Sequence, residues 1–216
     1  MFEQIPIRKG QQAPIVFIIL MSVFRSAVAD WYEVPTGSMK PTIEEGDRIL
    51  TDKMAYDLRI PFTHVSLLRL AEPKTGDIIV FDSKVAGNRL IKRVIGTPGD
   101  TISFQNNELT INDEKVSYST LNKSIQWLDK TEHLKGHAHT IRLTKSAASL
   151  VQFPATSIAA DHYLVMGDNR DNSTDSRVIG LITRDELLGR AERVIVSLDY
   201  DDYYLPRSDR FLKRLE

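Results

Sequence analysis

The stretch "GDIIVFDSKVAGNRLIKRVIGTPGDTISF", residues 76–104, decides the fold that the sequence predicts. It holds three short apolar runs, separated by the Gly, Pro and Asp residues that favour turns. Runs of this length between turn signals are typical of β-strands. Similar runs occur elsewhere in the chain, at residues 48–50, 108–113, 163–169 and 190–198. We therefore expect a mainly β fold.

Apart from these runs, three other segments lack the sequence pattern of a strand. Residues 183–189, "TRDELLG", predict one or two helical turns, with Thr183 as the cap and Gly189 as the stop. The stretch "RSDRFLKRLE", residues 207–216, has the pattern of a short amphipathic helix. The stretch from about 105 to 160 is more polar and less regular, so we interpret it as an inserted subdomain.

The composition is that of an ordinary globular protein, and it excludes several classes of partner and of catalytic site. The 216 residues are 42% hydrophobic and 26% charged, which is enough for one core with a smaller satellite. A net charge of -1 and the lack of a basic run argue against a nucleic-acid partner. The sequence has no cysteine, which excludes disulfides, thiolate catalysis and cysteine zinc sites.

An apolar run precedes the predicted strands. Residues 13–24, "APIVFIILMSVF", reach about 17 residues when the run is extended to Ala29, the lower limit for a membrane-spanning helix. A cleavable signal peptide that ends in the "AVA" of residues 27–29 and a buried core helix are the alternatives. Arg8 and Lys9 favour a cytoplasmic N-terminus for a spanning helix.

A serine that could act as a nucleophile follows this run. Ser38 lies in "VPTGSMKPTIEEGDRIL", residues 34–50, and has no histidine within 25 residues on either side. A serine hydroxyl needs a neighbouring base to take its proton. The "GHAH" of residues 136–139 could be a metal pair, but a third ligand is missing nearby, so we interpret it as a solvated loop.

Lys92 is the candidate base. In a strand over residues 89–96, its side chain shares a face with Leu90 and Val94, while Arg93 turns to the opposite face. A lysine between branched apolar neighbours can lose its charge, because burial lowers the pKa of an amine. The alternative is an edge-strand lysine that resists aggregation, and the pattern alone favours this alternative.

The stretch "MGDNRDNSTDSR", residues 166–177, follows a predicted strand and is dense in Asp, Asn, Ser and Thr. Such residues form tight turns that fix backbone and side chains together. A calcium loop is excluded, because the turn glycine and the final glutamate are absent. The simple interpretation is a polar loop, and the functional one is a set of supports for a nearby site.

Together these stretches resemble the type I signal peptidases, membrane-anchored serine proteases that remove signal peptides from exported proteins. "SMKPT" resembles the family's nucleophile motif, "GDIIVF" its strand motif, "RLIKRVIGTPGD" its general-base motif and "GDNRDNSTDSR" its last signature. The motifs occur in the family's order and span residues 25–104 and 163–198. The resemblance implies a β-rich catalytic domain, a barrel or sandwich, behind one N-terminal transmembrane helix.

The resemblance also implies the roles of the catalytic residues. Ser38 would be the nucleophile and Lys92 the general base. Thr36 would supply a hydroxyl to an oxyanion hole, together with the Ser38 backbone N–H. Threonine stands here where the family often has serine, and Lys40 stands where an uncharged residue is expected.

Supporting residues follow from the same resemblance. Ser173 would hydrogen-bond Lys92 and hold it in line, while Asp175 and Arg177 would pair as a brace. No metal, organic cofactor or nucleic acid is implied. The expected partners are precursors that carry signal peptides, with small residues at the cleavage site, and membrane lipid; the secretion machinery is a further candidate partner.

The implied topology divides the chain into three parts. Residues 1–12 would be a cytoplasmic tail, 13–29 the transmembrane anchor and 30–216 the extracytoplasmic catalytic domain with its inserted subdomain. This describes a single-pass protein of the inner membrane. Two alternatives stay open: a specialised peptidase for pilin or conjugation precursors with the same dyad, and a catalytically silent, membrane-anchored scaffold that binds peptides.

Overall fold

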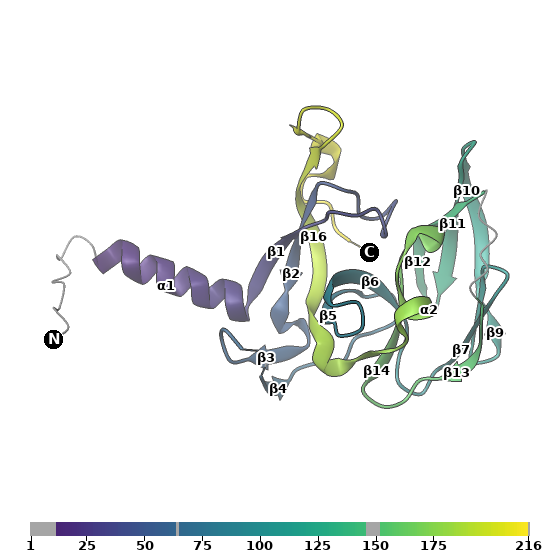
Figure 1. Ribbon diagram of the computed structural model, residues 1–216, viewed down its shortest axis with the longest axis horizontal. Coiled ribbons are helices and arrows are strands. Elements are labelled where there is room, and N and C mark those ends of the chain that lie inside the picture. Colours follow the sequence, from purple (N-terminus) through teal and green to yellow (C-terminus); the bar gives the residue numbers. More distant parts are fainter. Residues whose placement is uncertain (1–11, 64, 146–151, 216) are drawn as a thin grey trace.

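The computed structural model describes residues 12–63, 65–145 and 152–215. Figure 1 shows the helix α1, Gln12–Ala27, extending away from a body made of β-sheets. Where two named strands pair, they pair antiparallel. The predicted mainly β fold is therefore confirmed.

The largest sheet carries both the Ser38 and the Lys92 segments. Its path runs β1-β2-β16-β5-β6-β14-β15, and β17 pairs with β16. The strands are β1 Ala29–Glu33, β2 Asp47–Asp52, β5 Ile78–Ser83, β6 Asn88–Gly96, β14 His162–Met166, β15 Ile182–Thr183, β16 Leu187–Asp199 and β17 Leu205–Pro206.

Three smaller sheets complete the body. A four-stranded sheet has the order β13-β7-β8-β9, a three-stranded sheet is β10-β11-β12, and β3 pairs with β4 in a two-stranded ribbon. Their strands are β3 Asp57–Arg59, β4 Ser66–Arg69, β7 Thr101–Gln105, β8 Glu108–Ile111, β9 Glu114–Lys115, β10 Ser117–Lys123, β11 Trp127–Leu134, β12 His137–Thr144 and β13 Phe153–Ser157.

Short helical elements connect the strands. One further α-helical turn, α2, and four 3-10 turns are described; they are α2 Ser176–Ile179, η2 Lys53–Ala55, η3 Arg170–Asn172, η4 Arg184–Glu186 and η5 Ser208–Arg210.

The central strand β5 explains the deciding stretch of the sequence. It lies between β16 and β6, so both of its edges are hydrogen-bonded, and a core cluster covers each of its faces. Ile78 and Val80 belong to one core cluster, and Ile79 and Phe81 to a second cluster on the opposite face. A strand that is buried on both faces has a continuous apolar sequence rather than an alternating one.

The helix α1 ends at Ala27, and β1 begins two residues later. Within the described part of the chain, no helix is both long enough and apolar enough to cross a membrane. The anchor at residues 13–29 therefore stays a prediction. Of the predicted cytoplasmic tail at residues 1–12, only the last residue lies inside the described part.

Of the sequence predictions of short helices, the one at residues 183–189 is confirmed in part and the one at residues 207–216 is wrong. At residues 183–189 only the 3-10 turn η4 forms, because Leu187 and Gly189 pair with β5 and belong to β16. The backbone N–H of Thr183 donates to the Glu186 carboxylate at 2.7 Å, so the cap itself is correct. Residues 207–215 contain the 3-10 turn η5 instead of an amphipathic helix.

The stretch from about 105 to 160 is more regular than the sequence suggests. The strand predicted at residues 108–113 is confirmed as β8, which forms a hairpin with β9, whereas the β10–β12 meander was not predicted. Most of β10 is exposed, so its solvent-facing side chains are polar and the sequence pattern of a strand is weak. Its status as an inserted subdomain stays a prediction.

Candidate active site

Ser38 lies in the turn between β1 and β2, and a distant loop holds this turn in place. The backbone N–H of Asn169 donates to the Ser38 carbonyl at 3.0 Å, and the Asn169 side-chain amide donates to the Gly37 carbonyl at 2.9 Å. The next side chain, Met39, is buried in a core cluster. The serine therefore sits on a backbone that is fixed from both sides.

Lys92 reaches Ser38 from β6. It pairs with Ile79 of β5, and its neighbours Leu90 and Val94 pack in the same cluster as Ile79, so the predicted face is confirmed. Lys92 is 2% exposed, and its Nζ hydrogen-bonds to Ser38 Oγ at 2.8 Å and to the Ile91 carbonyl at 3.0 Å. The two side chains are 54 residues apart in the sequence.

The burial of Lys92 shifts its protonation equilibrium towards the neutral amine. Burial lowers the pKa of Lys92 to about 8, because the charged amine loses its hydration. The charges of Asp175 and Asp168 act in the opposite direction and favour the ammonium, while that of Arg177 lowers the pKa further. An amine with this pKa is partly neutral at physiological pH and can accept a proton.

A cleft of about 270 Å³ opens onto the two side chains. Thr36 lies exposed on its wall, next to Ser38. Most of the other lining is apolar and includes Val34, Pro35, Met39, Ile43, Leu90 and Ile91. A peptide bound there would meet a mainly apolar surface with the hydroxyl and amine groups at one end.

Asp175 and Arg177 form the predicted pair. Arg177 Nη2 lies 2.7 Å from Asp175 Oδ2, and both side chains are buried. Burial would raise the pKa of Asp175, but its contacts with Arg177 and with the Gly167 backbone N–H hold the pKa below its usual value. Asp175 is thus a fixed negative charge that orders the backbone at Gly167.

Ser173 does not make the hydrogen bond to Lys92 that the family resemblance implies. Its Oγ is buried without a hydrogen-bond partner and does not bond to Lys92. The hydroxyl packs against Gly167 instead, where an added Cβ would lie 2.3 Å from Ser173 Oγ and 2.5 Å from the Ser38 carbonyl oxygen. Gly167 therefore allows the Ser173 and Ser38 segments to approach each other.

Comparison with known proteins decides which family this arrangement represents. A family described as "Signal peptidase, peptidase S26" matches residues 8–196. The chain belongs to this family. Signal peptidase I of Pseudomonas aeruginosa is 35% identical over 85% of this chain and 70% of its own length. Signal peptidase I P of Bacillus subtilis subsp. natto is 30% identical over 87% and 88%.

One solved structure is also similar. A signal peptidase I from Enterococcus faecalis V583 has 26% sequence identity, with a TM-score of 0.36 over 56% of this chain and 97% of that chain. Membership of the S26 peptidases makes the chain a serine protease, and the family resemblance of its motifs is confirmed.

Two residues that support this S26 peptidase site were not predicted from the sequence. Asp168 binds the Arg93 guanidinium through two hydrogen bonds, at 2.9 and 2.8 Å, and accepts one from Thr42 Oγ1 at 2.5 Å. Asn169 holds the Ser38 turn, as described above. Both lie in the polar stretch 166–177, whose density of turn residues was the available signal.

Lys40, which stands where the family resemblance led us to expect an uncharged residue, has a local partner. Its Nζ lies 3.0 Å from Glu45 Oε2 in a partly exposed ion pair. An added Cβ on Gly37 would come within 3.2 Å of both of these side chains, so the pair packs against the turn that carries Ser38.

The interpretation of "GHAH" as a solvated loop is wrong. His137 and His139 lie on β12, and His139 is buried with its Nε2 3.2 Å from Glu132 Oε1. Burial lowers the pKa of His139. Glu132 also pairs with the buried Arg170, so this cluster supports the polar loop of the S26 peptidase site. In the described ranges, no group of three His, Asp or Glu is placed to hold a metal ion.

Proposed function

We propose that this chain is a membrane-anchored endopeptidase that removes signal peptides from exported precursors with a Ser38–Lys92 dyad. The observation that carries the proposal is the 2.8 Å contact between Ser38 Oγ and a buried lysine whose pKa is about 8. A structural lysine at a sheet edge would be charged and solvated. The names of the curated relatives support signal peptides as the substrate class.

The geometry supports a mechanism with a single base. Neutral Lys92 takes the proton of Ser38 as Oγ attacks the carbonyl carbon of the scissile bond. The Ser38 backbone N–H and the Thr36 hydroxyl stabilise the oxyanion, and one such donor is worth about 3–4 kcal/mol in proteases. Protonated Lys92 then gives its proton to the leaving amine, and water hydrolyses the acyl-enzyme.

Three further side chains support the dyad in this proposal. Asp175 and Arg177 fix the backbone at Gly167, which lies against the Ser38 turn. Ser173 fills the space beside that turn, against Gly167. The narrow apolar cleft suits an extended substrate with small side chains, Ala above all, at the -1 and -3 positions.

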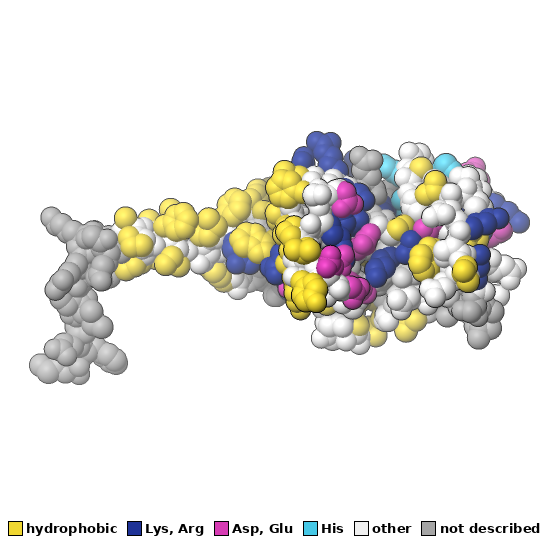
Figure 2. Space-filling model, turned by 90° about the horizontal axis from the view of Figure 1, so that it is seen from above, with side chains coloured by type: hydrophobic (Ala, Val, Ile, Leu, Met, Phe, Trp, Pro, Cys, Tyr) yellow, Lys and Arg dark blue, Asp and Glu magenta, His cyan; other side chains and the backbone are white. Residues whose placement is uncertain are grey.

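The membrane enters the proposal through α1. Its apolar side chains from Ile15 to Phe24 are mostly exposed, and Figure 2 shows them along the length of the helix. We assign residues 13–29 to a single-pass inner-membrane anchor, with 1–12 in the cytoplasm and 30–216 outside it. Lipid and signal-peptide precursors are the proposed partners, and a contact with the secretion machinery is compatible with this position.

The test is cleavage of a precursor with an Ala-X-Ala site by the full-length protein in lipid, beside its Ser38→Ala variant. We expect one product that begins after the motif and no product with Ser38→Ala. Cleavage by both proteins would contradict the dyad. If neither protein cleaves this precursor, the next substrates to test are pilin and conjugation precursors. If these also stay intact, the alternative of a catalytically silent scaffold is favoured.

A further inference from the structure

A second cavity lies along β6 from the Ser38 cleft. Ile91 lines the cleft, and Arg93, two residues later, lines the cavity. Residues two apart in a strand point to the same face and lie about 7 Å from each other. The cavity has a volume of about 630 Å³ and lies between β16 and the first residues of β12. No step of the proposed mechanism takes place there.

The lining of this cavity is rich in cations. Four arginines and two histidines line it, against two carboxylates. The arginines are Arg93, Arg190, Arg193 and Arg214, the histidines are His137 and His139, and the carboxylates are those of Asp77 and Glu192. The positive groups therefore outnumber the negative ones even if both histidines are neutral.

Two of the four arginines have carboxylate partners. Arg93 is bound by both oxygens of Asp168, at 2.9 and 2.8 Å. Arg190 Nη2 lies 2.6 Å from Glu192 Oε1, so this lining carboxylate already has a partner. The charges of these four side chains balance each other in pairs.

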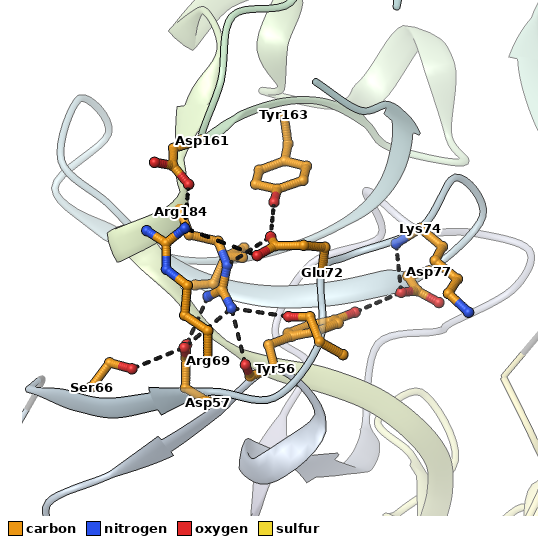
Figure 3. A network of polar contacts seen from close by, with 12 residues as sticks. Tyr56, Asp57, Ser66, Arg69, Glu72, Lys74, Asp77, Asp161, Tyr163 and Arg184 are labelled. Atoms are coloured by element: carbon orange, nitrogen blue, oxygen red, sulfur yellow. Dashed lines mark hydrogen bonds and ion pairs between the residues drawn. The ribbon is translucent and has the colours of Figure 1, made fainter. Parts of the chain in front are cut away.

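The other lining carboxylate is held by groups outside the cavity. Figure 3 shows Asp77 bound to the Tyr56 hydroxyl and to the Lys74 backbone N–H, at 2.8 and 2.9 Å. Arg193 and Arg214 form no ion pair with it or with any other residue that the structure describes. The excess positive charge of the cavity therefore belongs to these two arginines.

Arg193 and Arg214 face each other across an antiparallel bridge. The backbone N–H groups of Val194 and Leu215, the next residues along the two segments, donate across the bridge at 2.8 and 3.0 Å. The two arginines are thus a non-hydrogen-bonded pair, in which Cα atoms are about 4.5 Å apart and side chains lie closest. Like charges directly opposite each other in such a pair are destabilising.

An oxyanion is the ligand that suits this pair. A guanidinium presents its N–H donors in a fixed fork that fits the oxygens of a phosphate or carboxylate group. An anion between two facing guanidiniums replaces their repulsion by two attractive contacts. Arg193 is half-buried and Arg214 is exposed, so a ligand can reach both. His137 lines the same cavity and can add an N–H donor.

The cavity also borders the residues that support the Ser38 turn. Arg93 and His139 both lie against Asp168, and His139 Nε2 is 3.8 Å from Asp168 Oδ1. Asp168 in turn accepts a hydrogen bond from Thr42 Oγ1, four residues after Ser38. A ligand in the cavity would therefore lie next to the polar contacts that hold this turn.

We propose that this cavity is a binding site for an oxyanion, a phosphate group or a carboxylate, held between Arg193 and Arg214. A free phosphate ion and an acidic segment of a polypeptide are the two sources of this chemistry. The bound anion would tie residues 213–215 to β16. The inference does not rest on the proposed function, because binding requires neither Ser38 nor Lys92.

The first measurement is a titration of the full-length protein in detergent with inorganic phosphate, by calorimetry. Sodium chloride keeps the ionic strength constant, so general screening does not change. We expect one saturable site, about a tenfold weaker affinity in Arg193→Gln or in Arg214→Gln, and no measurable binding in the double variant. The control is Lys123→Gln with Lys145→Gln, which removes two cations from a separate cavity and should change the affinity less than about twofold.

Urea denaturation shows whether the variants fold. Without phosphate, the double arginine variant should be at least as stable as the unmodified protein, because the substitutions remove a repulsion between like charges. Phosphate should raise the urea midpoint of the unmodified protein and leave that of the double variant unchanged. This pattern distinguishes loss of the site from loss of the fold.

A second arm distinguishes the two sources of the oxyanion. A short peptide with two adjacent glutamates competes with phosphate, beside the same peptide with glutamines. Displacement by the glutamate peptide alone would identify an acidic polypeptide as a ligand of the site, and no displacement by either peptide would identify the small ion. Glu216 follows Leu215 and lies outside the described residues, so each titration is repeated with Glu216→Gln, which removes this neighbouring acid.

Two results would overturn the inference. One is the absence of saturable binding of both phosphate and the glutamate peptide, with and without Glu216→Gln. The other is binding that survives in the double arginine variant, since the anion would then occupy a different place. Precursor cleavage by the same preparations is scored separately: inactive protein that binds phosphate would count against the proposed function alone.

Discussion

Lys92 and Arg93 are consecutive residues of β6, both cationic by type and both almost completely buried, but their surroundings differ. Lys92 contacts a hydroxyl and a carbonyl and has no ion pair within the described chain. Arg93, on the opposite face, is bound by both oxygens of Asp168. One strand therefore holds a neutralisable amine on one face and a paired guanidinium on the other.

The difference shows what burial does to each kind of cation. A buried lysine without a carboxylate can lose its proton, and this makes it a base. A guanidinium keeps its charge in proteins, so it can be buried only with an anion. In the proposed mechanism, the identity of each side chain thus decides which face of β6 carries the base and which face supports the site.

The largest effect is expected for Lys92→Arg, which replaces the neutralisable amine by a permanent cation. A guanidinium cannot take the Ser38 proton, so we expect kcat/KM to fall by about 10³-fold or more. Lys84→Arg, on the exposed turn after β5, is the control and should remain active. Lys92→Met should be equally inactive but no less stable to urea, since it removes a buried amine. Appreciable turnover by Lys92→Arg would remove Lys92 from the mechanism.

Arg93→Met tests the other face. It leaves the Asp168 carboxylate buried and unpaired, so we expect the free energy of unfolding to fall by about 3–5 kcal/mol, measured by urea denaturation. Adding Asp168→Asn should recover part of this loss, because the uncompensated charge is removed. A decrease in the free energy of unfolding below about 1 kcal/mol would show that the Arg93–Asp168 ion pair contributes little to stability.

Gly167→Ala perturbs the contact between the two segments. The new Cβ would overlap with Ser173 Oγ and the Ser38 carbonyl, so we expect kcat/KM to drop about 10- to 100-fold through displacement of the nucleophile. Gly87→Ala is the control: its Cβ would meet nothing within 4 Å, although its positive φ costs some stability. Equal activities of the two variants would argue against a positioning role for Gly167.

The smallest effect is expected in the pH profile. Because Lys92 must be neutral to act, kcat/KM should rise as the pH increases through about 8. Asp175 is an anion that favours the ammonium form, so Asp175→Asn should move this rise to lower pH, by at most about one unit. A shift to higher pH would mean that another group controls the profile.

The sequence predicted the strands around this contrast well. The run of β5 begins with four consecutive apolar residues, and Lys92 and Arg93 stand between the apolar pairs of β6. Turn residues bound both strands, and alternation alone put Lys92 and Arg93 on opposite faces. The approach of Ser38 to Lys92 is different, because it depends on packing between segments 54 residues apart. No local pattern encodes that contact: the apolar neighbours of Lys92 made it a candidate base, and the family resemblance paired it with Ser38.

Other features were outside the reach of local patterns. Polarity made residues 136–139 look like a loop, but pairing with β11 makes them the start of β12. Ser173 has the hydroxyl that the resemblance expects, but its Oγ does not bond to Lys92, and the local sequence gives no sign of this difference. Leu67 and Leu68 would normally signal burial, so their exposure could be recognised only from the structure.

The two hydrogen bonds from Asn169 to the Ser38 turn have a consequence for biosynthesis. Asn169, which fixes the backbone beside Ser38, is made more than a hundred residues after the segment that it holds. A nascent chain that has not yet reached Asn169 therefore carries Ser38 in an unformed turn. The Ser38 turn can take its final form only after the polar loop of residues 166–177 has been synthesised and has folded onto it.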